Sequence, residues 1–177
     1  MSLTIRKETP EDLGAVYEVV KKAFEKEVYS DHDEQNLVNR LRKSAAFVAD
    51  LSLVAEFKGQ VVGHILFTEI QIGQATGLGL APVSVAPNHQ GKGIGSKLIE
   101  AGHALAKDLG YTFIVLLGHA DYYPRFGYHK ASQFGVLAPF DVPDESFMVL
   151  ELVEGALDDV EGMVVYDPAF FETDSTK

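Results

Sequence analysis

The stretch LAPVSVAPNHQGKGIGSKLIEAGHALAKDL, which runs from Leu80 to Leu109, decides the fold. It begins with a short apolar run containing β-branched residues, Leu80 to Val85, which Pro87 closes because proline cannot donate to a strand ladder. Glycine then occupies every second position from Gly91 to Gly95. A helical pattern follows, with one face made of Ile94, Leu98, Gly102, Leu105 and Leu109. The stretch therefore predicts a strand, a glycine loop and a helix, in that order.

The glycine loop has the composition of an anion-binding turn. Glycine allows positive φ angles and close approach of a ligand, and the first turn of a helix leaves N–H groups without intrahelical partners. Together these features form a cradle for a phosphate group, and Lys92 adds a positive charge beside it. The alternative is a turn that only connects a strand to a helix.

Spacing decides which phosphate ligand the loop suits. A nucleotide P-loop and a dinucleotide fingerprint both need a further glycine at the position that Ser96 occupies. The pattern Val85-x-Pro87-x-x-Gln90-Gly91-x-Gly93-x-Gly95 instead resembles the acyl-CoA signature of the GNAT superfamily of N-acyltransferases. A second family landmark, a tyrosine four residues before a Gly-aromatic pair, is similar to Tyr123 before Gly127-Tyr128.

The resemblance implies an α/β fold of mixed α+β type, in which a central, mostly antiparallel sheet contains a splayed parallel strand pair and carries flanking helices. It covers residues 3–152, which we expect to form the acetyltransferase domain. Residues 153–177 are expected to be a C-terminal extension that packs on the same domain and ends in a frayed tail from Glu172 to Lys177.

The resemblance also implies a binding site for acetyl-CoA as co-substrate. Its pantetheine arm would lie against the strand residues Val83, Ser84 and Val85, with backbone groups of Val83 and Val85 pairing with it. The pyrophosphate would be held by the cradle residues Gln90, Gly91, Lys92, Gly93, Ile94, Gly95 and Ser96. A backbone N–H near Val85 would stabilise the oxyanion, a contribution that can reach ~3 kcal/mol for one donor.

Attack of an amine on a thioester requires proton transfers. An alkyl ammonium has a pKa near ~10 and cannot attack while protonated, so a group must accept its proton directly or through water. Tyr123 matches the family's tyrosine, and its phenol is the expected general acid for the leaving thiolate. The alternative for Tyr123 is a buried aromatic with a satisfied hydroxyl, and Tyr122 is the neighbour with which it is most easily confused.

Several residues are candidates for the general base. Glu69 interrupts an apolar face of a long strand, where desolvation would raise the pKa of its carboxyl, although strand twist could instead bring it to solvent. His119 and Asp121 follow a strand whose end borders the opening, but polar loop residues are common there. His64 also lies on a bordering strand, where a hydrogen-bonded structural histidine is the competing interpretation.

Composition limits the function classes. The 177 residues are 46% hydrophobic, which suits one well-filled core, and they contain no cysteine, which excludes a cysteinyl-thioester route. A net charge of −11 argues against a nucleic acid or an anionic membrane as partner, and no apolar run approaches a membrane span, so we expect a cytoplasmic protein. The histidines show no metal-ligand spacing, so no metal is expected. A small-molecule or peptide amine is the expected partner, and a homodimer is left open.

The remaining segments fit such a domain. A strand is expected at Leu3–Lys7, and Thr9-Pro10 begins a helix. A loop from Val28 to His32 and a second helix at Asp33–Lys43 are expected after it. A hairpin joins Ser52–Phe57 to Gln60–Ile72 through Lys58-Gly59, before a turn from Gly73 to Gly79. Later strands are expected at Phe113–Leu117, Phe134–Leu137 and Ser146–Leu152, and the apolar segment Gly162–Phe171 should pack back on the body. The first helix should bury Leu13, Val16, Tyr17, Val20 and Phe24.

Three functions are compatible with these features. The leading one is an N-acetyltransferase that moves the acetyl group of acetyl-CoA to a primary amine by direct attack in a ternary complex. A second is a catalytically silent CoA-binding sensor or regulatory module that keeps the cradle. A third is an interaction protein whose acidic part, with eleven Asp or Glu and one Lys after residue 140, engages a basic partner.

Overall fold

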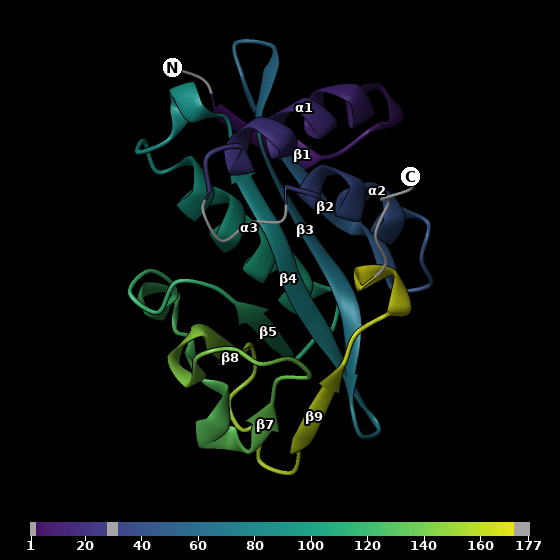
Figure 1. Ribbon diagram of the computed structural model, residues 1–177, viewed down its shortest axis with the longest axis vertical. Coiled ribbons are helices and arrows are strands. Elements are labelled where there is room, and N and C mark those ends of the chain that lie inside the picture. Colours follow the sequence, from purple (N-terminus) through teal and green to yellow (C-terminus); the bar gives the residue numbers. More distant parts are fainter. Residues whose placement is uncertain (1–2, 28–31, 172–177) are drawn as a thin grey trace.

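The computed structural model describes residues 3–27 and 32–171 (Figure 1). The tail expected at Glu172 to Lys177 and most of the loop expected at Val28 to His32 lie outside these ranges. None of the helices within the two ranges is long and apolar enough to cross a membrane.

One mixed sheet organises the chain. Its main path runs in the order β1-β2-β3-β4-β5-β8-β6. Along this path only β4 and β5 are parallel, and all other neighbours are antiparallel. The strands are β1 Leu3–Lys7, β2 Phe47–Phe57, β3 Gln60–Ile72, β4 Ala75–Val85, β5 Phe113–Leu117, β8 Phe147–Glu151 and β6 His129–Lys130. The fold class predicted from the sequence is confirmed.

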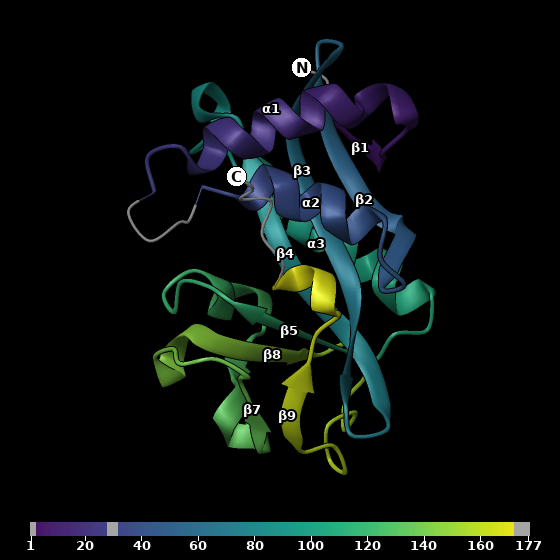
Figure 2. The same cartoon turned by 45° about the vertical axis from the view of Figure 1, so that its right-hand side comes forward.

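Helices cover both faces of the sheet. Figure 2 shows α1 (Leu13–Phe24) and α2 (Glu34–Arg42) across one face, with α3 (Ile94–Asp108) behind the other. Successive strand residues point to opposite faces, so Leu66 of β3 packs with α1 and α2, whereas Phe67 packs with α3. The predicted helix that follows the glycine loop is therefore a core element of the fold.

The parallel pair β4 and β5 splays apart, and this separation positions the site. The two strands pair only at Leu78 with Ile114 and at Gly79 with Val115. Beyond Gly79, β4 continues beside β3, with a bulge between the pairs Phe67–Leu80 and Ile65–Val83. The edge of β4 that faces away from β3 has no strand partner from Leu80 to Val85 among the described residues. Its backbone N–H and C=O groups are therefore available to a ligand.

The glycines before the splay do not form the turn expected from Gly73 to Gly79, so that prediction is wrong. The chain reverses at Gly73 and Gln74, and β4 already begins at Ala75. A Cβ on Gly77 would overlap the ring of Phe113, and one on Gly79 would lie 3.2 Å from the ring of Tyr166. These glycines let aromatic rings pack directly on the strand backbone, a role that composition alone does not distinguish from a turn.

The N-terminal helix begins as expected, but its buried face differs at one end. A 3-10 turn, Pro10–Asp12, precedes α1, and the Asp12 carboxylate accepts hydrogen bonds from the Thr9 N–H and hydroxyl at 2.7 and 3.0 Å. Val16 and Val20 are fully buried, whereas Leu13 is 40% exposed. Leu13 starts α1 beyond the edge of the apolar contact, which is why the prediction that it is buried is wrong.

Two other strands differ in extent from their predictions. β2 starts at Phe47, five residues earlier than expected, because Phe47 pairs with Thr68 beyond a register shift. The strand expected at Phe134–Leu137 is only β7, Val136–Leu137, since Phe134 ends a 3-10 turn and Gly135 has φ 73°.

The C-terminal part of the described chain packs on the body of the sheet. β9 (Gly162–Val165) pairs with β3 antiparallel and with β7 parallel. After it, Tyr166 and Phe170 lie with ring centroids 4.5 Å apart, and Tyr166 stacks on Phe140 at 5.9 Å. Figure 1 shows this yellow segment returning along β3 toward α2.

Candidate active site

A cavity of about 580 Å³ occupies the opening between the splayed strands. One wall is the β4 segment from Leu80 to Val85, and the opposite wall is the end of β5 with the loop that contains His119, Tyr122 and Tyr123. The third side is formed by the C-terminal end of α1 and the start of α2. The opening is therefore bordered by segments that are far apart in the sequence.

A second cavity of about 370 Å³ lies over the glycine loop, next to the first. Gly91 and Gly93 have φ angles of +79° and +83°, and Gly93 is the N-cap of α3. A Cβ at either glycine would meet no atom of the protein within 4 Å, so their bare backbone faces open space. The side chain of Gln90 donates to the Val85 carbonyl at 2.9 Å and ties the loop to the end of β4. This is the geometry of an anion cradle at a helix N-terminus.

The residues predicted to form the cradle contribute to the second cavity in different ways. Gly91, Gly93, Gly95 and Ser96 line the second cavity, and so do Gln90 and Ile94. The Ile94 side chain is 6% exposed and belongs to the core, so Ile94 offers the cavity mainly its backbone. Lys92 is exposed and does not line this cavity, which leaves its charge beside the loop rather than in it.

The two adjacent tyrosines differ clearly. The Tyr122 hydroxyl lies 3.2 Å from the Ser96 hydroxyl, at the boundary of the two cavities. Tyr123 lines only the opening between the strands, is 7% exposed, and packs its ring where a side chain on Gly118 would lie. Burial, with a smaller effect of Tyr122, raises the pKa of the Tyr123 phenol, so this hydroxyl stays protonated at neutral pH.

The structure brings Val83, Ser84, Val85 and His119 to the same opening as Tyr123. It does not bring Glu69 there. The Glu69 carboxylate accepts a hydrogen bond of 2.6 Å from the Tyr111 hydroxyl, just beyond the C-terminal end of α3, and Glu69 lines neither cavity. Glu69 pairs with Leu78 before the strands splay, so the register of β3 holds it away from the opening. Asp121 also lies outside the lining of both cavities.

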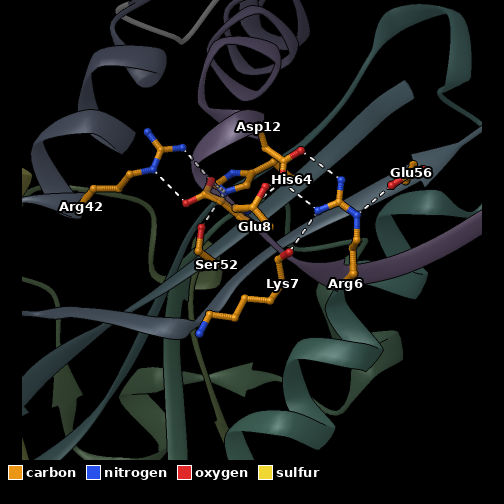
Figure 3. Close-up of polar contacts among 9 residues, drawn as sticks. Arg6, Lys7, Glu8, Asp12, Arg42, Ser52, Glu56 and His64 are labelled. Atoms are coloured by element: carbon orange, nitrogen blue, oxygen red, sulfur yellow. Dashed lines mark hydrogen bonds and ion pairs between the residues drawn. The ribbon is translucent and has the colours of Figure 1, made fainter. Parts of the chain in front are cut away.

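His64 belongs to a buried polar cluster under the first helices (Figure 3). Its ring is fully buried, with Nε2 at 2.9 Å from the Ser52 hydroxyl and 3.4 Å from a Glu8 carboxylate oxygen. Arg42 donates two hydrogen bonds to Glu8, at 2.9 and 2.7 Å. Burial lowers the pKa of His64, which keeps the imidazole neutral. The cluster links β2, β3 and the residue that follows β1 to α2, so His64 is a hydrogen-bonded structural histidine.

Comparison with known proteins agrees with this geometry. The family model described as "Acetyltransferase (GNAT) domain" matches residues 48–130. The uncharacterized N-acetyltransferase YjhQ of Escherichia coli is 37% identical over 144 residues, which cover 76% of this chain and 74% of YjhQ. The chain belongs to the GNAT acetyltransferase family. The E. coli relative YhbS, also called an uncharacterized N-acetyltransferase, is 29% identical over 95% of this chain and 98% of its own.

Two solved GNAT structures share the whole architecture. The YhbS crystal structure, in complex with CoA, has a TM-score of 0.87 at 28% identity and covers 97% of this chain and 94% of its own. A GNAT family acetyltransferase from Brucella melitensis, in complex with acetyl-CoA, has a TM-score of 0.80 at 38% identity, with 96% and 98% covered. These two solved structures therefore share the fold that contains the splayed strand pair and the glycine loop of this GNAT protein.

The structure adds one cation to the GNAT cradle that sequence reasoning missed. Arg125 lines the second cavity, and its guanidinium lies 4.6 Å from the centroid of the Tyr122 ring. Its Nε donates to the Tyr122 carbonyl at 2.9 Å, which fixes the side chain across the turn. The sequence contains a signal for Arg125, because it stands two residues after Tyr123 in the second landmark, and the 3-10 turn Tyr123–Phe126 places it beside Tyr122.

Among the described residues no group of three or more His, Asp or Glu side chains could hold a metal ion.

Proposed function

We propose that this GNAT protein is an N-acetyltransferase that transfers the acetyl group of acetyl-CoA to a primary amine by direct attack in a ternary complex. The observation that carries the proposal is that the two cavities share the lining residues Val85, Gln90, Gly95 and Tyr122, so that an anion cradle adjoins an opening lined by a protonated, buried tyrosine. The complexes of two similar proteins with CoA and with acetyl-CoA support the same donor.

The donor fits the residues present. N–H groups of the loop from Gly91 to Ser96 would hold the pyrophosphate, since the glycines leave their backbone open and α3 begins there. Arg125 and Lys92 supply positive charge close by, which a protein of net charge −11 needs in order to bind a polyanion. The unpaired edge of β4 at Val83 and Val85 would pair with the pantetheine arm as an added strand would.

The chemistry then needs one bond formed, one broken and two proton movements. The amine nitrogen bonds to the thioester carbon, the carbon–sulfur bond breaks, and the products are an N-acetyl amine and CoA thiol. Tyr123 donates its phenolic proton to the leaving sulfur, and the amine gives up one proton to the solvent side. We assign His119 as the group that accepts this proton directly or through water, because it is exposed at the opening whereas Glu69 lies elsewhere.

Thermal unfolding with acetyl-CoA tests the donor. At a ligand concentration about 100 times the dissociation constant, binding to the native state stabilises by ~2.7 kcal/mol, or roughly 5–10 °C for a chain of this size. We expect this shift with acetyl-CoA but not with ATP or NAD. Absence of a shift would show that the cradle assignment is wrong, and a shift without turnover on any amine would favour a silent CoA-binding module.

Tyr123→Phe tests the acid. Loss of a general acid typically costs 10²- to 10⁴-fold in rate, so we expect a large fall in kcat with an unchanged dissociation constant for acetyl-CoA. Tyr166→Phe is the matched control, because Tyr166 is also 7% exposed but lies in the C-terminal aromatic cluster. Equal activity of the two variants would remove Tyr123 from the mechanism.

A further inference from the structure

The side of the opening that faces α1 and α2 is acidic. Glu27 follows the end of α1, Glu34 begins α2, and both line the opening. The lining contains no lysine or arginine among the described residues. Glu34 at the start of a helix also suits the helix dipole, but Glu27 lies just past a helix C-terminus, where a negative charge brings no such stabilisation. The helix dipole therefore does not account for the negative charge at Glu27.

A buried hydroxyl in the same opening points to a ligand. Ser84 lines the opening and is 2% exposed, and its Oγ has no hydrogen-bond partner within the described part of the chain. A buried hydroxyl without a partner is costly, and such groups are uncommon in folded proteins. Ser84 is paired with His64 across β3 and β4, so it lies on the face that α1 and α2 cover. A ligand that donates an N–H to Ser84 would satisfy it.

The acidic groups and the reacting position impose opposite demands on one amine. A carboxylate beside an amine favours the ammonium form, whereas attack on the thioester needs the neutral form. Both demands are met if the acceptor carries two nitrogens, of which one reacts and the other stays charged. Phe24 and Leu37, which also line the opening, offer apolar surface for a methylene chain between the two nitrogens.

On the basis of the proposed function, we propose that the acceptor is an aliphatic diamine or polyamine without a carboxylate. Its reacting nitrogen donates a hydrogen bond to the Ser84 hydroxyl on the β4 wall of the opening, which lies opposite the wall that contains Tyr123. Its second nitrogen remains an ammonium and lies against Glu27 and Glu34. An acceptor that carries a carboxylate would be repelled by these side chains and would find no cation in the lining.

Three amines of equal chain length test this assignment: 1,5-diaminopentane, pentylamine and 5-aminopentanoate. They present a second positive charge, no second charge and a negative charge at the same distance from the reacting nitrogen. Release of CoA is measured with each at saturating acetyl-CoA. We expect kcat/KM for the diamine to exceed that for pentylamine at least tenfold, and 5-aminopentanoate to be the poorest of the three.

The variant Glu27→Gln distinguishes loss of diamine recognition from a general loss of folded, active protein. We expect it to lower kcat/KM for the diamine about tenfold while changing kcat/KM for pentylamine less than twofold. Glu25→Gln is the matched control, because Glu25 is exposed just after α1 but does not line the opening, and its loss changes the net charge equally. Ser84→Ala should lower kcat/KM for both amines, since it removes the acceptor of a hydrogen bond from the reacting nitrogen.

The outcomes distinguish this inference from the proposed function. Transfer to pentylamine as efficient as to the diamine, or an equal loss for both amines in Glu27→Gln, would overturn the diamine assignment and leave acetyl transfer standing. Acetyl-CoA binding without transfer to any of the three amines would overturn the diamine assignment, and only the absence of transfer to every amine tested, peptide amines included, would overturn the proposed function. A diamine preference that Glu27→Gln removes and Glu25→Gln preserves would establish the assignment.

Discussion

Glu8 should make the free energy of unfolding depend on pH through a buried ion pair. Its side chain is 7% exposed and receives two hydrogen bonds from Arg42, whose side chain is 12% exposed (Figure 3). Burial by itself would raise the pKa of this carboxyl, but the hydrogen bonds from His64 and Arg42 outweigh it and lower the pKa from 4.5 to about 2. Because burial keeps His64 neutral, Arg42 supplies the compensating charge.

The size and sign of the effect follow from proton linkage. At about 1.4 kcal/mol per pKa unit, the lowering from 4.5 to about 2 corresponds to roughly 3 kcal/mol of stability. The unfolded chain binds the proton more tightly, so this contribution is fully present above about pH 5 and is lost as the pH falls toward 2. Between pH 7 and pH 3 about 2 kcal/mol of it should disappear.

The assay is urea unfolding of wild-type protein and of Glu8→Gln at a series of pH values from 7 to 3. We expect the wild type to lose about 2 kcal/mol more than the variant over this range, since glutamine does not titrate. Asp50→Asn is the control, because the Lys7–Asp50 pair is more than half exposed on both sides and should contribute less than ~1 kcal/mol at any pH. The same pH dependence in wild type and Glu8→Gln would refute the assigned pairing.

Three further changes test the packing and the cradle. Gly93→Val should abolish stabilisation by acetyl-CoA in thermal unfolding, because a branched residue at φ +83° is strained and projects into the space over the loop; normal binding would refute the cradle. Gly77→Ala should lower the free energy of unfolding by about 1–3 kcal/mol in urea, since its Cβ meets the Phe113 ring, and a neutral effect would show that the ring moves aside freely. Arg125→Met should weaken acetyl-CoA binding, measured by titration calorimetry, and should make the affinity less sensitive to salt; an unchanged salt dependence would argue that Arg125 is remote from the phosphates.

The strand, glycine loop and helix to which we assign the donor could be predicted from local sequence. Strand, glycine loop and helix are contiguous, and an anion cradle uses backbone N–H groups whose positions follow from glycine spacing and the helix start. The order and type of most elements followed in the same way from apolar periodicity. Their ends were less predictable, because Phe47 extends β2 through pairing with Thr68, a contact that no local pattern contains.

The acceptor side is formed by segments that the sequence separates widely. Glu27, Ser84 and His119 line the same opening only because β4 bends away from β5 and the first two helices cover one face of the sheet. Glu69 shows the converse, since it shares a strand face with Ile65 and Phe67 as its alternation with them predicts, but the register of β3 places it beside Tyr111. Local periodicity and glycine spacing determined which face of a strand or helix a residue takes and where the open glycine loop lies. Only the tertiary packing decided which side chains share a cavity, because strand register, splay and helix placement depend on contacts across the whole chain.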